Sequence, residues 1–123
     1  MGLHRSGEMY LETIYILSQN LKAVRALDVS EKMGFSKPSV SRALKLLIKD
    51  GYIDVESNGY ITLSDTGISI AKKMFERHTI LTKMLVDLGV DENTAAEDAC
   101  KIEHDISDKT FNAIKEHMTK YNN

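Results

Sequence analysis

Three residues in the stretch DACKIEHDI, at positions 98–106, are of the types that bind a metal ion. Cys100, Glu103 and His104 stand at i, i+3 and i+4, so on a helix they project from one face within about one turn. A thiolate, a carboxylate and an imidazole there can hold one divalent transition ion, and the thiolate favours a softer ion over magnesium or calcium. The alternative is an ordinary helix with its cysteine in the core and its glutamate and histidine in water.

The composition is that of a globular protein with two oppositely charged regions. The 123 residues are 42% hydrophobic and 28% charged, and the single cysteine cannot form an internal disulfide. Residues 22–49 carry seven Lys or Arg against two acids, whereas residues 87–108 carry eight acids against one lysine. One region could face a polyanion and the other could hold a cation. No stretch approaches the length of a membrane span or the apolar core of a signal peptide, so we expect a cytoplasmic protein.

Apolar spacing and capping residues predict six helices and one β-hairpin. The hairpin is indicated by YIDVESNGYITL at 52–63, which alternates apolar and polar residues about Asn58-Gly59. The long helix has an apolar stripe that includes Phe75, Leu88 and His78, and a histidine in such a stripe is more often a core residue than a ligand. The helices are expected at 7–20, 26–33, 36–50 and 64–88, followed by one capped by Asp91 and one capped by Ser107. A boundary near residue 72 predicts two domains, 1–71 and 72–123.

Two short helices followed by a hairpin have the order of a winged helix-turn-helix. On the second of these helices, Arg42 could reach a guanine edge, the ring of Pro38 could touch a thymine methyl, and lysines could meet phosphates. The alternative is an ordinary solvated charged face, but the hairpin and the turn at Gly34 favour DNA binding. Because one monomer would make few contacts, we expect a homodimer on a palindromic operator. The candidate DNA-binding residues are Ser36, Lys37, Pro38, Ser39, Ser41, Arg42, Lys45 and Asn58.

Five segments follow one another along the chain: GEMYLETIYIL, SKPSVSRALKLLIKDGYI, TLSDTG, ERHTILTKML and EDACKIEH. On these segments the sequence resembles the DtxR/MntR family of iron- or manganese-dependent bacterial repressors. The resemblance implies a mainly α fold, in which an N-terminal winged helix-turn-helix with a two-stranded wing precedes an all-α dimerisation domain. Because the sequence stops at Asn123, we expect the short, two-domain form without the SH3-like third domain of longer members.

The same resemblance implies a ligand set. The activating site of the iron-responsive branch joins a methionine on the first helix to a cysteine, a glutamate and a histidine, and the residues at these places are Met9, Cys100, Glu103 and His104. In the manganese branch carboxylates replace the methionine and the cysteine, and Glu12 and His78 match two further positions. An ancillary site of the iron branch keeps His78 alone of its three ligands, with Thr82 and Ala96 at the other two places. We expect Fe(II) as the preferred ion and Mn(II) next.

These features predict a metal-dependent repressor of metal-homeostasis genes, without enzymatic activity, a small organic substrate or a membrane partner. Residues far apart in sequence, Met9 and Glu12 on one side and the Cys100 cluster on the other, would hold one ion and fix the orientation of the two halves. The alternatives are a regulator independent of metal or one that senses redox state through the Cys100 thiol. A metalloenzyme with Glu103 as general base is a further alternative, although no nucleophile or phosphate loop accompanies it.

Overall fold

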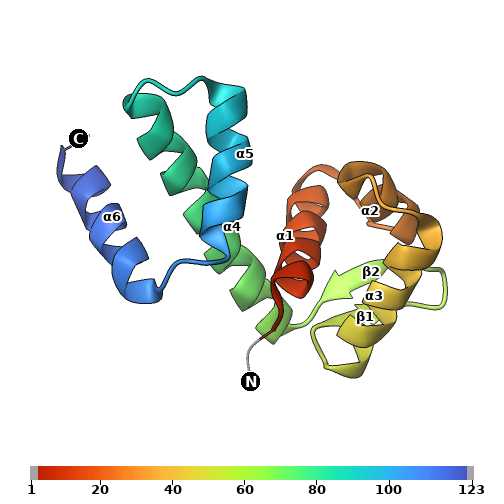
Figure 1. Ribbon diagram of the computed structural model, residues 1–123. Coiled ribbons are helices and arrows are strands. Elements are labelled where there is room, and N and C mark those ends of the chain that lie inside the picture. The colour runs from red at the N-terminus through yellow and green to blue at the C-terminus, as the bar shows by residue number, and fades with distance from the viewer. Residues whose placement is uncertain (1–2, 122–123) are drawn as a thin grey trace. The chain divides into compact units, whose positions relative to one another are not determined.

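The computed structural model describes residues 3–121, which divide into two compact units, one up to Lys72 and one from Lys73 onward. The first unit contains α1 (Arg5–Asn20), α2 (Ala26–Met33), α3 (Lys37–Lys49), β1 (Ile53–Val55) and β2 (Ile61–Leu63). The helix α4 (Asp65–Asp87) begins in the first unit and continues into the second, which also holds α5 (Glu92–Glu103) and α6 (Asp108–Tyr121) (Figure 1). The expected mainly helical fold with a two-stranded wing is confirmed. No helix among the described residues is long and apolar enough to cross a membrane.

One apolar core holds the first unit together. On α1 the residues Tyr10, Leu11 and Ile14 are buried, and on α3 the residues Val40 and Leu44 lie one turn apart and are buried too. Each such side chain stabilises the unit by roughly 1.5–3 kcal/mol when it leaves water. The remaining core residues come from the loop after α1, from α2, α3 and both strands, and from the start of α4: Val24, Val29, Leu47, Ile53, Ile61 and Ala71. The wing and the two short helices are therefore anchored on α1.

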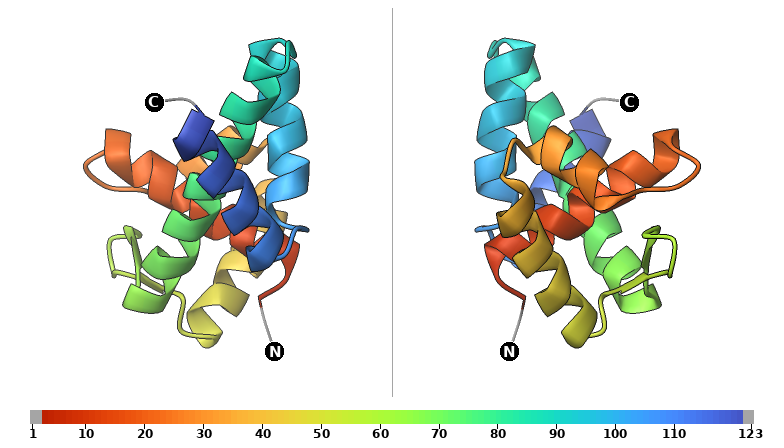
Figure 2. Two further views of the ribbon diagram at one scale, coloured as in Figure 1. Left: turned by 90° about the vertical axis from the view of Figure 1, so that its left-hand side faces the viewer. Right: turned by 90° about the vertical axis from the view of Figure 1, so that its right-hand side faces the viewer.

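The turn between α2 and α3 is set by residues with special backbone roles. Gly34 ends α2 in the left-handed region, at φ 72°, where a residue without a Cβ is favoured. Ser36 then caps α3 by accepting a hydrogen bond from the Ser39 N–H at 3.3 Å. Pro38 follows in the first helical turn, where a missing N–H costs nothing. This turn places α3 at the surface of the unit, as the right-hand view of Figure 2 shows.

The wing is an antiparallel hairpin with Ile53 opposite Leu63 and Val55 opposite Ile61. Its connection is wider than the two-residue turn that Asn-Gly often forms, because Asn58 does not share the positive φ of Gly59, which is 89°. Instead the Glu56 N–H donates to the Tyr60 carbonyl at 2.9 Å and the Gly59 N–H donates to the Glu56 carbonyl at 2.8 Å. On the other edge, the Ile61 N–H donates to the Val24 carbonyl at 2.8 Å, which ties the wing to the loop after α1.

The start of α4 is fixed against the start of the wing. The Ser64 hydroxyl donates to the Gly51 carbonyl at 2.8 Å and accepts from the Gly67 N–H at 3.1 Å. A Cβ on Gly67 would lie 2.2 Å from the Tyr52 carbonyl oxygen. Only glycine therefore allows this close approach.

The second unit is built from three helices, and α5 runs back along α4 after the turn at Gly89 (Figures 1 and 2). Asp91 caps α5 by accepting from the Thr94 N–H at 3.0 Å, and this bond lowers the pKa of the Asp91 carboxyl. Ser107 caps α6 through the Thr110 N–H at 3.1 Å. The buried apolar residues are Met74, Leu81, Ala95, Ala99, Phe111 and Met118. Phe75 and Leu88, which the sequence places in the apolar stripe, are 40% and 74% exposed in the monomer.

Candidate functional site

The three residues from which the sequence predicts metal binding lie together at the end of α5. One ligand atom from each of Cys100, Glu103 and His104 lies within 4.8 Å of the other two. Cys100 is half-buried, Glu103 is the last residue of the helix and fully buried, and His104 follows as the C-cap with near-helical dihedrals. The helical conformation extends through His104, so the i, i+3, i+4 spacing brings the three side chains to one face.

The spacing of these atoms suits a shared ion. Ligand atoms bonded to one transition ion at about 2.0–2.3 Å are at most about 4.6 Å apart, and the three atoms here lie within 4.8 Å of one another. Small side-chain rotations therefore suffice to bring them onto one centre. The donor set also fits, because a buried carboxylate beside an imidazole favours a positive charge between them.

A second imidazole reaches the same carboxylate from α4. His78 Nδ1 lies 2.9 Å from Glu103 Oε2, and His104 Nε2 lies 3.3 Å from Glu103 Oε1. Glu103 thus has an imidazole near each of its two oxygens. His78 is half-buried and is more than a core residue, since its ring is engaged with a candidate ligand.

Met9 and Glu12 belong to the first unit, where they lie three residues apart on α1. A spacing of three residues puts both side chains on neighbouring positions of one helical face. Their participation in an ion site with the Cys100 cluster stays a prediction. With one ligand of three present, we expect no separate ancillary site, and this too stays a prediction: His78 and Thr82 lie one turn apart on α4, and the methyl group of Ala96 cannot bind an ion.

A buried arginine beside this cluster is absent from the sequence-based candidates. Arg77 is 4% exposed and its guanidinium donates to the carbonyls of Glu103 at 2.8 Å and Ile106 at 2.9 Å, and to Asp108 Oδ1 at 2.5 Å. A signal existed in the sequence, because Arg77 is three residues after Met74 and four before Leu81, on the inward spacing of the helix. A charged residue at such a position needs a partner inside the fold.

The candidate DNA-reading residues lie at the surface of α3 and before it. Lys37, Pro38, Ser41, Arg42 and Lys45 are exposed, and Val40 and Leu44 on the opposite side are buried. The Ser36 hydroxyl donates to the Ser39 hydroxyl at 2.9 Å, which lies 3.5 Å from Arg42 Nη2. This loose chain of polar groups leaves the guanidinium of Arg42 accessible to a partner.

The wing presents Asn58 at its exposed turn, where the side chain is partly committed to the backbone. Asn58 Oδ1 accepts from the Tyr60 N–H at 3.1 Å, so its amide NH₂ group is the part that faces outward. Arg25, the N-cap residue of α2, lies 4.6 Å from the centre of the Tyr60 ring and holds the base of the turn.

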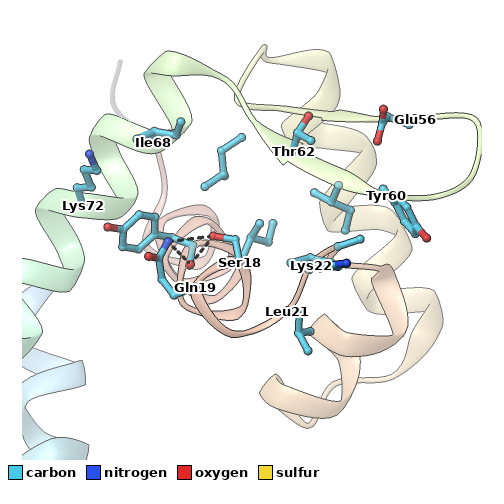
Figure 3. A pocket seen from close by; sticks show the side chains of 15 residues that line it. Ser18, Gln19, Leu21, Lys22, Glu56, Tyr60, Thr62, Ile68 and Lys72 are labelled. Atoms are coloured by element: carbon cyan, nitrogen blue, oxygen red, sulfur yellow. Dashed lines mark hydrogen bonds between the residues drawn. The ribbon is translucent and has the colours of Figure 1, made fainter.

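A hollow of about 490 Å³ lies between α1, the wing and the start of α4 (Figure 3). Its labelled lining includes Ser18 and Gln19 of α1, which both bond the Tyr15 carbonyl, and Ile68 and Lys72 of α4. None of the candidate metal-binding or DNA-reading residues lines it.

The fold and the clustered donors define a winged-helix DNA-binding protein with a metal-binding helical unit. Two family descriptions match consecutive parts of the chain: iron dependent repressor, N-terminal DNA binding domain, over residues 2–60, and iron dependent repressor, metal binding and dimerisation domain, over residues 64–122. The chain therefore belongs to the iron-dependent repressor family, which confirms the resemblance seen in its motifs.

Similar proteins are transcriptional regulators. An HTH-type transcriptional regulator of Methanocaldococcus jannaschii is 35% identical over 121 residues, 97% of each chain. The HTH-type transcriptional regulator MntR of Lysinibacillus sphaericus is 33% identical over 89% of this chain and 78% of its own. A solved manganese-dependent transcriptional repressor in complex with manganese matches with a TM-score of 0.84 and 27% identity over 92% of this chain. This chain spans about half of that solved repressor, 52% of its length.

Proposed function

We propose that this protein is a cytoplasmic transcriptional repressor that senses Fe(II) or Mn(II), with Fe(II) preferred, and controls genes of metal homeostasis. The observation that carries the proposal is the cluster of Cys100, Glu103 and His104, whose ligand atoms lie within 4.8 Å of one another in the part matched by a metal-binding domain. The family is one of transcriptional regulators, so we propose regulation and not catalysis as the role of these residues.

The preference for Fe(II) rests on the chemistry of the donors. Cys100 offers a thiolate and Met9 a thioether, and both are softer than the carboxylates that suit manganese. Glu12 and Glu103 are hard donors and keep Mn(II) as the second candidate. Two similar solved structures are named for manganese, so the exchange of these two sulfur ligands is the natural test of selectivity.

The proposed control of DNA binding uses donors from both units. Met9 and Glu12 on α1 and the cluster at the end of α5 together make a set that neither unit supplies alone. When bound, a divalent ion supplies the positive charge that these donors share. Without that charge, Glu12, Glu103 and the Cys100 thiolate repel one another, and the two units are free to turn. By linkage, DNA raises the affinity for the ion by the same factor as the ion raises the affinity for DNA.

In a symmetric dimer, the orientation of the two units determines the spacing of the two α3 helices and therefore the affinity for DNA. In a homodimer the two α3 helices must be spaced by a turn of DNA, or a multiple, to enter successive major grooves of a palindromic operator. Ser36, Ser39, Ser41 and Arg42 would approach bases and the sugar-phosphate backbone, and Lys37 and Lys45 would meet phosphates. We propose the amide group of Asn58 as the wing's contact.

The second unit offers a face for the second copy. A mostly apolar hollow of about 440 Å³ lies between α4 and α6, lined by Met84, Ile114 and His117 among others. Leu88 and Tyr121 are 74% and 64% exposed. Large exposed apolar side chains on the unit matched by a dimerisation domain support a dimer formed through this unit. We propose residues 1–71 as the DNA-binding domain and residues 72–123 as the metal-binding and dimerisation domain.

The experiment that tests the proposal is an anaerobic titration of demetallated protein with Fe(II), Mn(II), Co(II) or Zn(II), read by binding to a labelled library of palindromic DNA. We expect selection of a common sequence only in the presence of a bound ion, with the strongest response to Fe(II). Cys100→Ser should weaken this response, and the double change Met9→Asp with Cys100→Asp should move the preference toward Mn(II).

A matched control is Lys101→Ala, because Lys101 is the neighbour of Cys100 and its side chain is 73% exposed. This variant should respond to metal as the unaltered protein does. If fully demetallated protein selects and binds DNA as tightly as loaded protein, the proposal is wrong.

A further inference from the structure

Arg77 and His78 are consecutive residues of α4, and both contact Glu103 on α5, one at its backbone and the other at its side chain. His78 Nδ1 lies 2.9 Å from the Glu103 carboxylate, and Arg77 Nη1 donates to the Glu103 backbone carbonyl at 2.8 Å. All of these residues lie in the second unit. Glu103 is therefore held by α4 at its side chain and at its backbone.

The guanidinium of Arg77 also fixes the chain beyond Glu103. Its Nη1 donates to the Ile106 carbonyl at 2.9 Å and its Nη2 to Asp108 Oδ1 at 2.5 Å, and its Cζ lies 5.4 Å from the centre of the Phe111 ring. These contacts span the end of α5, the turn and the start of α6. His104, which lies inside this span, is thereby restricted at its backbone.

Capping alone does not require such an arrangement. Carbonyls at a helix C-terminus can bond to water, and a guanidinium taken out of water loses hydration that its partners must offset. Arg77 is 4% exposed, and no described group accepts from its buried Nε. A buried donor without an acceptor destabilises the folded state, so the position of this side chain is kept at a cost in stability.

We propose that Arg77 is a positioning residue for metal binding, and that it holds the Glu103 carboxylate and the His104 imidazole in place before an ion arrives. The inference rests on the proposed function, because it assigns Arg77 a role toward the same donor cluster. Since the donors are already ordered, little conformational entropy is lost when they bind an ion, and the affinity is higher than for a mobile set.

The test compares metal affinity and spectrum in folded proteins. Arg77→Lys keeps the charge but cannot reach two carbonyls and a carboxylate with one planar fork. In a calorimetric titration of metal-free protein, we expect its affinity for Co(II) and Mn(II) to fall by about 10–100-fold, the usual cost of losing a partner that orients a ligand. At saturation with Co(II), the thiolate-to-cobalt absorption should also shift, because the ligands settle in a different geometry.

Two variants separate positioning from general stability. Lys115→Met removes an ion pair between α4 and α6, Lys115 with Glu76 at 2.9 Å, which lies outside the contacts of Arg77. It should leave Co(II) affinity and spectrum unchanged. Asp108→Ala removes one partner of Arg77 from an exposed position, and should lower the affinity in the same direction but less. If Arg77→Lys does not fold, the metal affinity of Asp108→Ala tests the positioning role of Arg77 in its place.

The outcomes distinguish this inference from the proposed function. If Glu103→Gln weakens metal binding but Arg77→Lys and Asp108→Ala keep the unaltered affinity and spectrum, Arg77 is only a helix cap and the inference is wrong. If Glu103→Gln itself leaves the affinity unchanged, the donor cluster is not the site and the proposed function fails with it. A loss in Glu103→Gln and Arg77→Lys, with none in Lys115→Met, supports both.

Discussion

Each of the two units contains an arginine whose guanidinium group is important to the proposed function, and the two groups have opposite environments. Arg42 on α3 is exposed, and its guanidinium donates to the Ser39 hydroxyl at 3.5 Å. Arg77 on α4 is 4% exposed and donates to two carbonyls and a carboxylate. The Arg42 guanidinium is accessible to a partner from outside, whereas the Arg77 guanidinium forms its hydrogen bonds within the protein.

The difference follows from the size of the proposed partners. DNA is larger than the protein and meets it at a surface, so the groups that read it must stay in water until the encounter. An ion is smaller than a side chain, and several donors must be gathered around it inside the fold. Glu103 is accordingly fully buried, whereas Lys37 and Lys45 remain exposed.

The largest effect we expect is the difference in stability between Arg77→Ala and Arg42→Ala. Loss of Arg77 leaves the carbonyls of Glu103 and Ile106 without their donor, and each buried acceptor left without a hydrogen bond costs about 1–3 kcal/mol. Arg42→Ala should change the free energy of unfolding by less than about 0.5 kcal/mol, as surface substitutions do. Urea unfolding of the metal-free proteins measures both. Equal losses in the two variants would contradict the contrast between the units.

For sequence-specific DNA binding we expect the reverse order, with the larger effect in Arg42→Ala. For folded, metal-loaded Arg42→Ala, discrimination between the preferred sequence and a changed base pair should fall by about 1–3 kcal/mol, the value of a bidentate contact to a base. Competition binding against DNAs with single base-pair changes measures this loss. A uniform loss of affinity across all sequences would mean that Arg42 contacts only phosphate.

The sequence predicted the elements well because each is specified locally. Gly34 and Ser36 define the helix-turn-helix turn, and alternation about Asn58-Gly59 defines the wing. The cluster of Cys100, Glu103 and His104 could also be predicted, since three side chains within one helical turn need no tertiary information.

Contacts between helices could not be read in the same way. The bond between His78 and Glu103 depends on how α4 packs against α5, and the role of Arg77 depends on where the turn before α6 runs. No periodicity in a single helix encodes such distances. For the same reason Phe75 and Leu88 fit the apolar stripe of α4 and are nonetheless exposed in the monomer.

A smaller effect should distinguish the lysines of α3 from Arg42. Lys45→Ala should weaken binding to all DNA sequences alike and reduce the slope of log affinity against log salt concentration by about 1, the contribution of one phosphate contact. Binding measured across a series of salt concentrations gives this slope. Lys101→Ala, in the other unit, is the control and should leave the slope unchanged. If Lys45→Ala instead alters sequence preference, it reads a base.

The smallest effect concerns Asp108, the exposed partner of buried Arg77. A hydrogen bond and charge attraction from Lys73, with a further contribution from Arg77, lower the pKa of the Asp108 carboxyl. A carboxyl whose pKa is lowered in the folded state adds stability that is fully present above its unfolded pKa, about 3.9, and is lost as the pH falls through the lowered value. The unfolding midpoints of metal-free wild type and Asp108→Asn should therefore differ by a constant amount from pH 7 to about pH 4.5 and converge below. A difference that persists at the lowest pH would show that Asp108 acts through hydrogen-bond geometry and not through its charge, and the pairing of Arg77 with an exposed acid would then contribute little to the contrast with Arg42.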